Sequence, residues 1–136
     1  MKWLQKLLGG TPASPSVTAS FRKDPNGVYM LRIGGVLNKA TLDNIQSAGR
    51  HVIEAGAKEL KVLLFLEEFR GWKRGDDWGD LDFFGRYEAA IAKIAVVGET
   101  RWEEETFLFL GAGRRHGEVR YFPPHFEGKA RTWLAS

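Results

Sequence analysis

Two short apolar runs in the middle of the chain restrict the folds that it can adopt. They are Lys61–Leu66 and Lys93–Gly98, and no polar side chain interrupts either run after its opening lysine. Apolar runs of this length, without polar alternation, are typical of strands covered on both faces in a parallel sheet. Because parallel strands are joined by crossovers that usually contain a helix, the runs predict a sheet with helices packed on its faces.

The first strands of the predicted domain form a hairpin. The strands are Val17–Lys23 and Val28–Ile33, and the Asp-Pro-Asn-Gly segment between them has the residues of a tight turn. Apolar residues then recur at helical spacing from Thr41, the expected N-cap, to Gly56. The remaining predicted elements are a polar, aromatic-rich loop over Glu67–Asp77, helices over Trp78–Ala92, Trp102–Leu110 and Phe126–Ala135, and a strand over Glu118–Phe122.

The resulting element order is ββαβαβαβα. It predicts an α/β single domain with a mostly parallel mixed sheet, an antiparallel N-terminal hairpin and about four flanking helices. We expect this domain to span residues 17–136, after a short amphipathic helix over residues 1–9 and a Pro/Ser linker over residues 10–16.

The N-terminal segment carries one apolar face, formed by Trp3, Leu4, Leu7 and Leu8. A helix this short is not stable alone in water, so we expect it to pack against something. The alternatives are a membrane surface, a partner chain such as a second copy in a homodimer, and the protein's own groove. No apolar stretch approaches the roughly 20 residues that cross a bilayer, and no signal peptide is evident. The expected location is cytoplasmic, with peripheral membrane contact as one alternative.

Composition and charge exclude several classes of function. The chain has no cysteine, which excludes disulfide scaffolds, thiol nucleophiles and cysteine-ligated metal centres. Its net charge is +3, but the basic residues are dispersed and form no stripe that could follow a phosphate backbone. We therefore expect no nucleic acid among the partners.

Histidine, serine and carboxylate side chains are present, but their spacing matches no metal-binding or catalytic motif. His51, His116 and His125 are not at the spacing of metal ligands, and no serine lies in a nucleophile elbow. The carboxylates gather near predicted helix starts, where they offset the helix dipole. Gly111–Gly117 is rich in glycine and arginine but follows a helix, which suits a helix cap better than a phosphate site. We expect no cofactor and no metal. An enzyme is the third alternative, for which the carboxylates or His125 would supply the titratable group.

An unusual aromatic group follows the first buried strand. The chain has 9 Phe, 5 Trp and 3 Tyr, and ligands of open α/β sheets bind beyond the carboxyl ends of the strands. Two interpretations stay open: the rings pack the core and cover its end, or they line an apolar pocket for a hydrophobic ligand. The candidate ligand-binding residues are Phe69, Trp72, Trp78, Phe83, Phe84 and Tyr87.

Several segments together resemble the SpoIIAA-like family of small bacterial proteins. The similarity covers Val17 to Leu134. It is carried by Gly35-Val-Leu, Val62-Leu-Leu-Phe-Leu, Glu68-Phe-Arg-Gly-Trp72, Asp77-Trp78, Leu81-Asp-Phe83, Ile94-Ala-Val-Val-Gly98, Trp102, Val119-Arg-Tyr-Phe122 and Ala130-Arg-Thr-Trp-Leu134.

The resemblance implies a STAS-like fold related in shape to the CRAL-TRIO lipid-binding domains. STAS proteins that antagonise anti-sigma factors carry a phosphorylatable Ser or Thr after the central strand, whereas Glu67–Asp77 contains neither. The expected function is therefore a non-enzymatic binding domain for a small apolar or lipid-like ligand or a membrane surface. The alternative is a STAS-type protein–protein interaction or regulatory module without the phosphorylatable residue.

Overall fold

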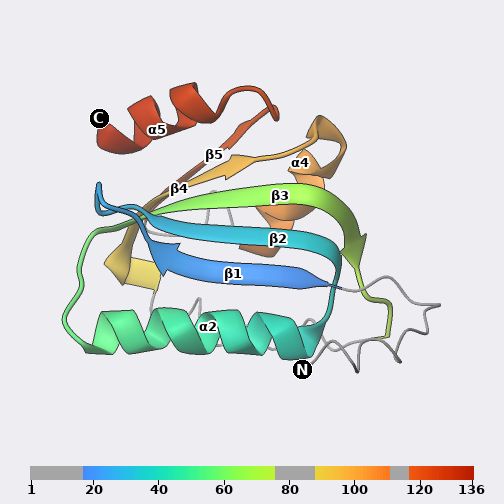
Figure 1. The fold of residues 1–136 in the computed structure, drawn as a ribbon, viewed down its shortest axis with the longest axis horizontal. Helices are drawn as coiled ribbons and strands as arrows, with labels where there is room; N and C mark the ends of the chain where they lie inside the picture. The colour runs from blue at the N-terminus through green and yellow to red at the C-terminus, as the bar shows by residue number, and fades with distance from the viewer. Residues whose placement is uncertain (1–16, 76–87, 111–116) are drawn as a thin grey trace.

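The computed structural model describes residues 17–75, 88–110 and 117–136. These residues form one mixed sheet with helices on both faces (Figure 1). The elements are, in chain order, β1 (Thr18–Lys23), β2 (Tyr29–Leu37), α2 (Lys39–Glu54), β3 (Leu60–Trp72), the 3₁₀ turn η1 (Glu88–Ala90), β4 (Ile91–Val97), the 3₁₀ turn η2 (Thr100–Trp102), α4 (Glu103–Leu110), β5 (Glu118–Phe122) and α5 (Glu127–Ala135).

The sheet has the predicted topology. Its five strands lie in the order β1-β2-β3-β4-β5, β1 is antiparallel to β2, and every other neighbouring pair is parallel. The turn between β1 and β2 is closed by Asp24, whose carboxylate accepts hydrogen bonds from the backbone N–H groups of Asn26 and Val28 at 2.9 and 3.0 Å. The predicted α/β class, mixed sheet and N-terminal hairpin are confirmed.

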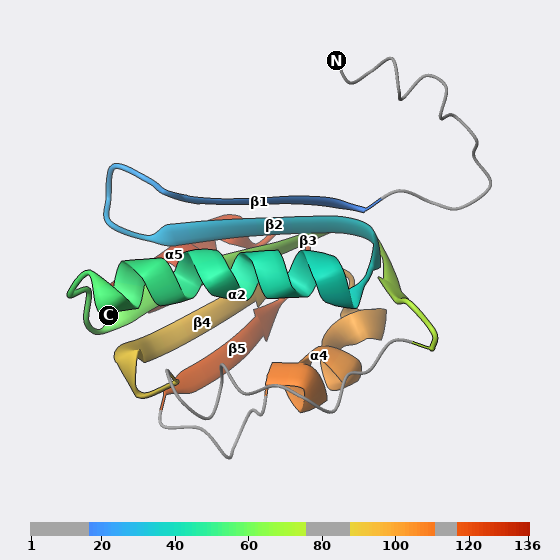
Figure 2. The same ribbon diagram turned by 90° about the horizontal axis from the view of Figure 1, so that it is seen from below.

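Helices α2 and α4 lie on one face of the sheet, and α5 lies on the other (Figures 1 and 2). Alternation along β3 supplies both cores, because Leu64 and Leu66 pack on the α2 face while Leu63 and Phe65 pack on the α5 face. This two-sided burial is the physical reason for the uninterrupted apolar run in the sequence.

Strand β3 is longer than predicted and contains a bulge. Ile33 of β2 pairs with Leu66, but Gly35 pairs with Phe69, so two β3 residues lie opposite one on β2. Within the bulge, Glu68 has a φ of +54°, a conformation that few non-glycine residues adopt. The extra residue restores Phe69 to the same face as Leu66. The prediction of a loop from Glu67 onward was therefore wrong as far as Trp72, because polar side chains on an open face hid the strand.

Helix α2 begins one turn earlier than predicted. Asn38 is its N-cap, with the side-chain oxygen accepting a hydrogen bond from the backbone N–H of Thr41 at 2.7 Å. Thr41, the expected cap, is instead the third helical residue of α2. The helix ends before Gly56, whose φ of +111° needs glycine.

The helix predicted over Trp78–Ala92 is wrong at its C-terminal end. Residues 88–90 form the 3₁₀ turn η1, and β4 starts at Ile91, two residues before the predicted strand. The small apolar residues from Ala89 to Ala92 fit either a helix or a buried strand, and the pairing of Ile91 with Leu60 of β3 selects the strand. Residues 78–87 lie outside the described part of the chain. Three α-helices are present in the described part, against the expected four or so.

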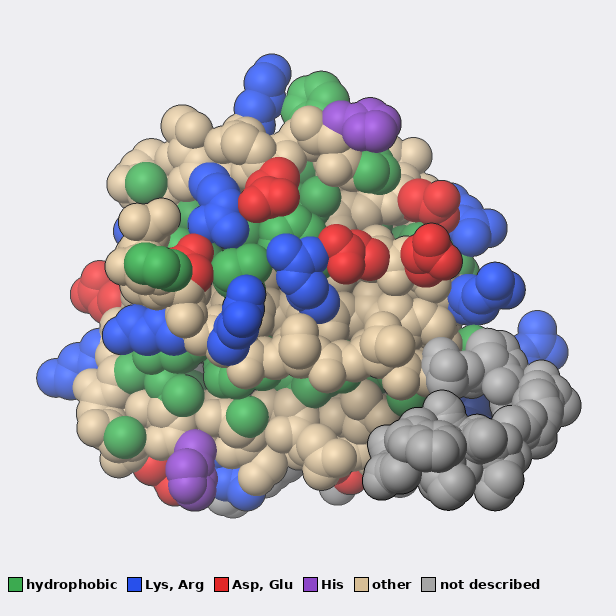
Figure 3. All heavy atoms as spheres, in the orientation of Figure 1, with side chains coloured by type: hydrophobic (Ala, Val, Ile, Leu, Met, Phe, Trp, Pro, Cys, Tyr) green, Lys and Arg blue, Asp and Glu red, His purple; other side chains and the backbone are tan. Residues whose placement is uncertain are grey.

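Helix α5 packs on β3, β4 and β5 and leaves the β1–β2 side of that face open (Figure 1). Basic and acidic side chains are interspersed over this face, with apolar side chains between them (Figure 3). Arg32, for example, lies over the Phe65 ring at 4.1 Å and pairs with Glu67 at 2.6 Å. Charged side chains thus cover a part of the sheet that none of the described helices covers.

Arg131 joins α5 to the distant β1–β2 turn. Its guanidinium donates hydrogen bonds to Asp24 and Glu127, each at 2.9 Å. The Asp24 side chain is 9% exposed, and the hydrogen bond from Arg131 holds the pKa of that carboxyl below its ordinary value of 3.8. The ionised form of Asp24 therefore stabilises the folded state above about pH 4, and this contribution is lost as the pH falls below that value.

We expect Arg131→Met to lower the melting temperature at neutral pH, because it leaves the Asp24 carboxylate without its cation. The difference from the native chain should shrink as the pH falls below about 4, because protonation of Asp24 removes the charge that Arg131 pairs with. Circular dichroism melts across this pH range measure both effects. Arg101→Met is the matched control, because the Arg101–Glu99 pair is exposed on both sides and should contribute little. A difference that does not depend on pH would contradict the assignment to Asp24.

We expect Gly34→Ala to destabilise the fold by roughly 1–3 kcal/mol through overpacking. A Cβ at Gly34 would lie 2.5 Å from the backbone carbonyl oxygen of Glu67 in the bulge, and backbone cannot move aside as a side chain can. Gly128→Ala on α5, where a Cβ meets open space, is the control. Urea unfolding of both variants tests this, and an unchanged midpoint for Gly34→Ala would mean that the bulge is not tightly constrained.

Candidate functional site

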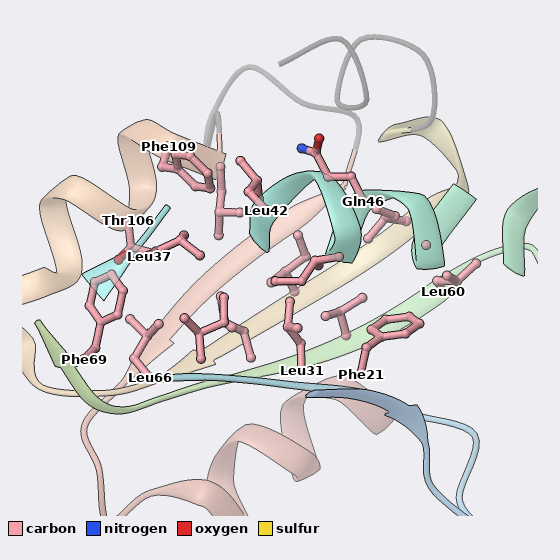
Figure 4. A pocket seen from close by; sticks show the side chains of 18 of the residues that line it. Phe21, Leu31, Leu37, Leu42, Gln46, Leu60, Leu66, Phe69, Thr106 and Phe109 are labelled. Atoms are coloured by element: carbon pink, nitrogen blue, oxygen red, sulfur yellow. The ribbon is translucent and has the colours of Figure 1, made fainter. Parts of the chain in front are cut away.

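A cavity of about 110 Å³ lies between α2, α4 and the sheet (Figure 4). We call it the α2 cavity. Among the described residues that line it, none is charged, and Gln46 and Thr106 are the polar ones apart from the indole nitrogen of Trp72. Figure 4 shows Leu37, Phe69 and Thr106 at one end of the cavity and Leu60 and Phe21 at the other.

The cavity follows from the residues that α2 turns toward the sheet. Leu42, Ile45, Gly49 and Ile53 line it from the helix, and their spacing places them on one face. Gly49 lines the cavity with backbone alone, because it has no side chain. A glycine inside a helix costs about 1 kcal/mol relative to alanine, which α2 tolerates at the point where it faces the cavity.

Four aromatic rings pack together where β3 ends. We call Phe69, Trp72, Trp102 and Phe109 the aromatic cluster. Phe69 contacts Trp72 and Trp102 edge to face, with ring centroids 5.0 and 5.1 Å apart. Trp72 also contacts Trp102 at 6.1 Å and Phe109 at 5.8 Å. Each such pair contributes about 0.5–1.5 kcal/mol beyond its buried area, so the cluster holds α4 against the end of β3.

Four buried polar atoms lack a hydrogen-bond partner among the described residues, and three of them belong to residues that line the α2 cavity. The three that belong to the cavity lining are the side-chain nitrogens of Gln46 and Trp72 and the hydroxyl of Thr106. The fourth is the indole nitrogen of Trp102. Thr106 is 2% exposed. An unpaired buried polar group costs roughly 1–3 kcal/mol, and native proteins contain few of them. Figure 4 shows the Gln46 amide turned away from the apolar side chains below it, whereas Thr106 lies among them.

The structure brings two of the predicted ligand-binding residues into the lining of the α2 cavity. These are Phe69, which is 4% exposed, and Trp72, which is half-buried. Phe69 and Trp72 are consistent with both interpretations of the aromatic group, as core packing and as the wall of an apolar pocket. Their rings pack in the core and also border the α2 cavity. Their contact with a ligand stays a prediction. The other predicted site residues lie outside the described residues: Trp78, Phe83, Phe84 and Tyr87, and the N-terminal Trp3, Leu4, Leu7 and Leu8.

Sequence reasoning missed the contribution of α4 to the site. Trp102 was expected only to begin a helix, and Thr106 and Phe109 were not singled out. A signal was present, because Trp102, Thr106 and Phe109 are spaced so that they share one helical face. This spacing could not show where along the sheet α4 packs, which is at the end of β3.

Other reactive groups in the described part of the chain have structural explanations. The Tyr121 hydroxyl donates a hydrogen bond to the Glu99 carbonyl oxygen at 2.6 Å. Burial, with the nearby carboxylates of Glu103 and Glu99, raises the pKa of Tyr121 to about 12, so it stays protonated at neutral pH. No group of three His, Asp or Glu side chains that could hold a metal ion occurs among the described residues. None of the helices described is long and apolar enough to cross a membrane.

The fold is similar to that of a solved structure. An uncharacterized protein of the DUF3478 family from Shewanella loihica, with a SpoIIAA-like fold, superposes with a TM-score of 0.66 over 91% of this chain and 98% of that chain. The two sequences are 16% identical, so this likeness concerns the fold alone. No curated protein matches the sequence. A family model described as SpoIIAA-like matches residues 28–135. Because this match spans most of the chain, the protein belongs to the SpoIIAA-like family.

Proposed function

We propose that this protein is a non-enzymatic binding domain that takes a small apolar or lipid-like ligand in the α2 cavity. The observation that carries this proposal is the cavity itself, about 110 Å³ of space with apolar walls between α2, α4 and the sheet. Concave sites lined mostly by apolar side chains are common ligand sites. Family and fold support a binding or regulatory module at this coarse level, and the ligand is our proposal.

The size of the cavity limits the ligand. Sites for drug-sized molecules enclose roughly 300–1,000 Å³, whereas an engineered apolar cavity of about 150 Å³ binds benzene. The α2 cavity is closer to the second case. It therefore suits a ligand of benzene size or the end of a longer chain, with the rest of that chain outside the cavity.

A protein-interaction module is the second candidate, and one observation favours it. Leu108 of α4 is 70% exposed, next to the aromatic cluster on the same helix. An exposed leucine alone is common on protein surfaces, so this candidate, including a homodimer, has less support than the cavity. A stoichiometric protein partner recovered together with an empty α2 cavity would favour it.

We expect toluene to raise the melting temperature of the native chain in proportion to its occupancy. Gly49→Leu places a side chain in the cavity and should abolish this shift, while the stronger helix propensity of leucine offsets part of any packing strain. Gly128→Leu on α5 makes the same substitution in open space and should leave the toluene shift intact. Equal shifts in all three proteins would show that toluene binds elsewhere.

We also propose that the apolar face of Trp3, Leu4, Leu7 and Leu8 makes peripheral membrane contact. Two charged residues and four apolar ones give weak attachment at most. Trp3→Ser with Leu7→Ser should therefore reduce co-sedimentation with anionic phosphatidylglycerol vesicles several-fold without changing the melting temperature. Leu108→Ser is the control for an exposed apolar residue on α4. Equal sedimentation of the native chain and the double variant would remove the membrane contact from the proposal.

A further inference from the structure

The outer edge of β1 has the features of a site for an additional strand. In the described part of the chain β1 pairs with β2 alone, and five of its six residues are exposed. Its pairing with β2 runs from Thr18 to Lys23 without a bulge, and it contains no proline. Sheets usually protect such an edge with a bulge, a proline or a covering helix or loop. Because α5 packs on β3, β4 and β5, it does not supply this cover.

The hairpin turn determines which backbone groups lie on this edge. The N–H of Asp24 donates a hydrogen bond to the carbonyl oxygen of Val28 at 2.9 Å. Hydrogen-bonded and non-hydrogen-bonded pairs alternate along an antiparallel ladder, so every second residue of β1, counted back from Asp24, bonds to β2. The residues between them direct their N–H and C=O groups to the outer edge. These residues are Ala19, Phe21 and Lys23.

The two sides of β1 present different surfaces to the side chains of an added strand. On one side, Ala19 and Phe21 border a groove of about 360 Å³ together with Ile45 and Ala48 of α2, which runs beside β1 (Figure 1). None of the residues that line this groove is charged. Side chains alternate along a strand, so every second side chain of an added strand would enter the groove. The others would lie on the opposite side of the sheet, beside Arg22.

The charge of β1 selects the kind of strand that fits. Arg22 and Lys23 are exposed, and β1 has no acidic residue. Lys23 lies over the Tyr29 ring at 5.6 Å, and Arg22 takes part in none of the ion pairs among the described residues. Opposite charges on directly opposed residues stabilise a strand pair. An acidic strand therefore complements this edge.

The chain itself offers no such strand next to β1. A second copy of β1 would bring two more cations and no carboxylate. Residues 1–16, which precede β1, contain Lys2 and Lys6 and no acidic residue. Charge complementarity therefore favours a different protein as the source of the added strand.

We infer that the outer edge of β1 binds an extended acidic segment of a partner protein as an additional strand, antiparallel to β1. Acidic residues of that segment lie opposite Lys23 and Arg22, and apolar residues lie opposite Phe21 and Ala19. In this mode of recognition, backbone hydrogen bonds supply affinity and alternate side chains supply specificity. Antiparallel pairing is slightly more stable per residue than parallel pairing. The inference goes beyond the proposed ligand of the α2 cavity and does not require that the cavity be occupied.

The test titrates the end-capped peptide Asp-Glu-Val-Thr-Val-Thr into the full ¹⁵N-labelled chain. Paired antiparallel, its acidic residues lie opposite Lys23 and Arg22 and its valines opposite Phe21 and Ala19. We expect saturable downfield shifts of the amide protons of Ala19, Phe21 and Lys23, because these protons gain acceptors. The same peptide with both valines N-methylated keeps its side chains but loses the donors that face β1, and it should not bind.

Charge reversal tests the acidic character of the partner. Arg22→Glu should weaken the peptide about fivefold and should prefer Asp-Lys-Val-Thr-Val-Thr, in which lysine replaces the glutamate. Arg50→Glu is the matched control, because Arg50 is an exposed arginine of α2 that does not line the groove. It should keep the preference of the native chain for the acidic peptide.

A proline tests the backbone pairing from the side of the protein. Ala19→Pro removes an N–H that points away from β2, which an edge strand tolerates. This variant should lose the peptide-induced shifts and keep its fold. Circular dichroism melts of each variant verify that it is folded.

Several results would overturn the inference. The first is the absence of saturable shifts at millimolar peptide, and the second is equal binding of the N-methylated peptide. The third is a peptide preference that Arg22→Glu does not reverse. Shifts of β1 amides that depend on protein concentration without peptide would assign the edge to a second copy. Protection of the Ala19, Phe21 and Lys23 amides from hydrogen exchange at every protein concentration without peptide would assign it to the chain's own residues.

Discussion

The β-bulge at Glu67 and Glu68 determines which side chains of the central strand face the α2 cavity. Side chains alternate along a strand, so without the bulge Phe69 would lie on the opposite face from Leu66. The extra residue opposite Gly34 places both on the α2 face. Phe69 can then contact Trp72 and Trp102. The aromatic cluster, and through it the position of α4 at the end of the cavity, depends on this irregularity in one strand.

The packing on the two faces of the sheet differs. On the α5 face, Leu63, Ala95, Ala130 and Leu134 are fully buried, and Arg131 ties the helix to the β1–β2 turn. On the α2 face a cavity lies beneath the helix, and three of its lining residues have buried polar atoms with no hydrogen-bond partner in the described part of the chain. Proteins tend to break the rules of packing and hydrogen bonding at sites of function. The α5 face therefore stabilises the fold, and the α2 face holds the cavity in which we propose that a ligand binds.

Much of the fold could be predicted from the sequence, and the errors have particular causes. The hairpin follows from the turn that contains Asp24. The parallel pairing of β3 and β4 follows from the two apolar runs. The end of β3 was missed because Glu67, Glu68 and Arg70 are exposed, and these polar residues conceal the strand that continues through the buried Phe69. Asn38 was overlooked as the N-cap because Thr41 has the same capping chemistry and stands nearer to the apolar residues. In the site, Phe69 and Trp72 were identified, whereas Thr106 and Phe109 were not.

The sequence by itself determined the fold class, the hairpin and the aromatic character of the segment that follows the central strand. Hydrophobic periodicity and turn chemistry are local, and they act over a few neighbouring residues. The tertiary structure alone decided that Trp72 contacts Trp102 and Phe109, that Gly49 lines the α2 cavity, and that the buried Thr106 hydroxyl has no hydrogen-bond partner among the described residues. These properties depend on how α2 and α4 pack on a sheet whose register the bulge shifts. No local pattern records whether a buried hydroxyl finds an acceptor, because the acceptor would come from residues far away in the chain.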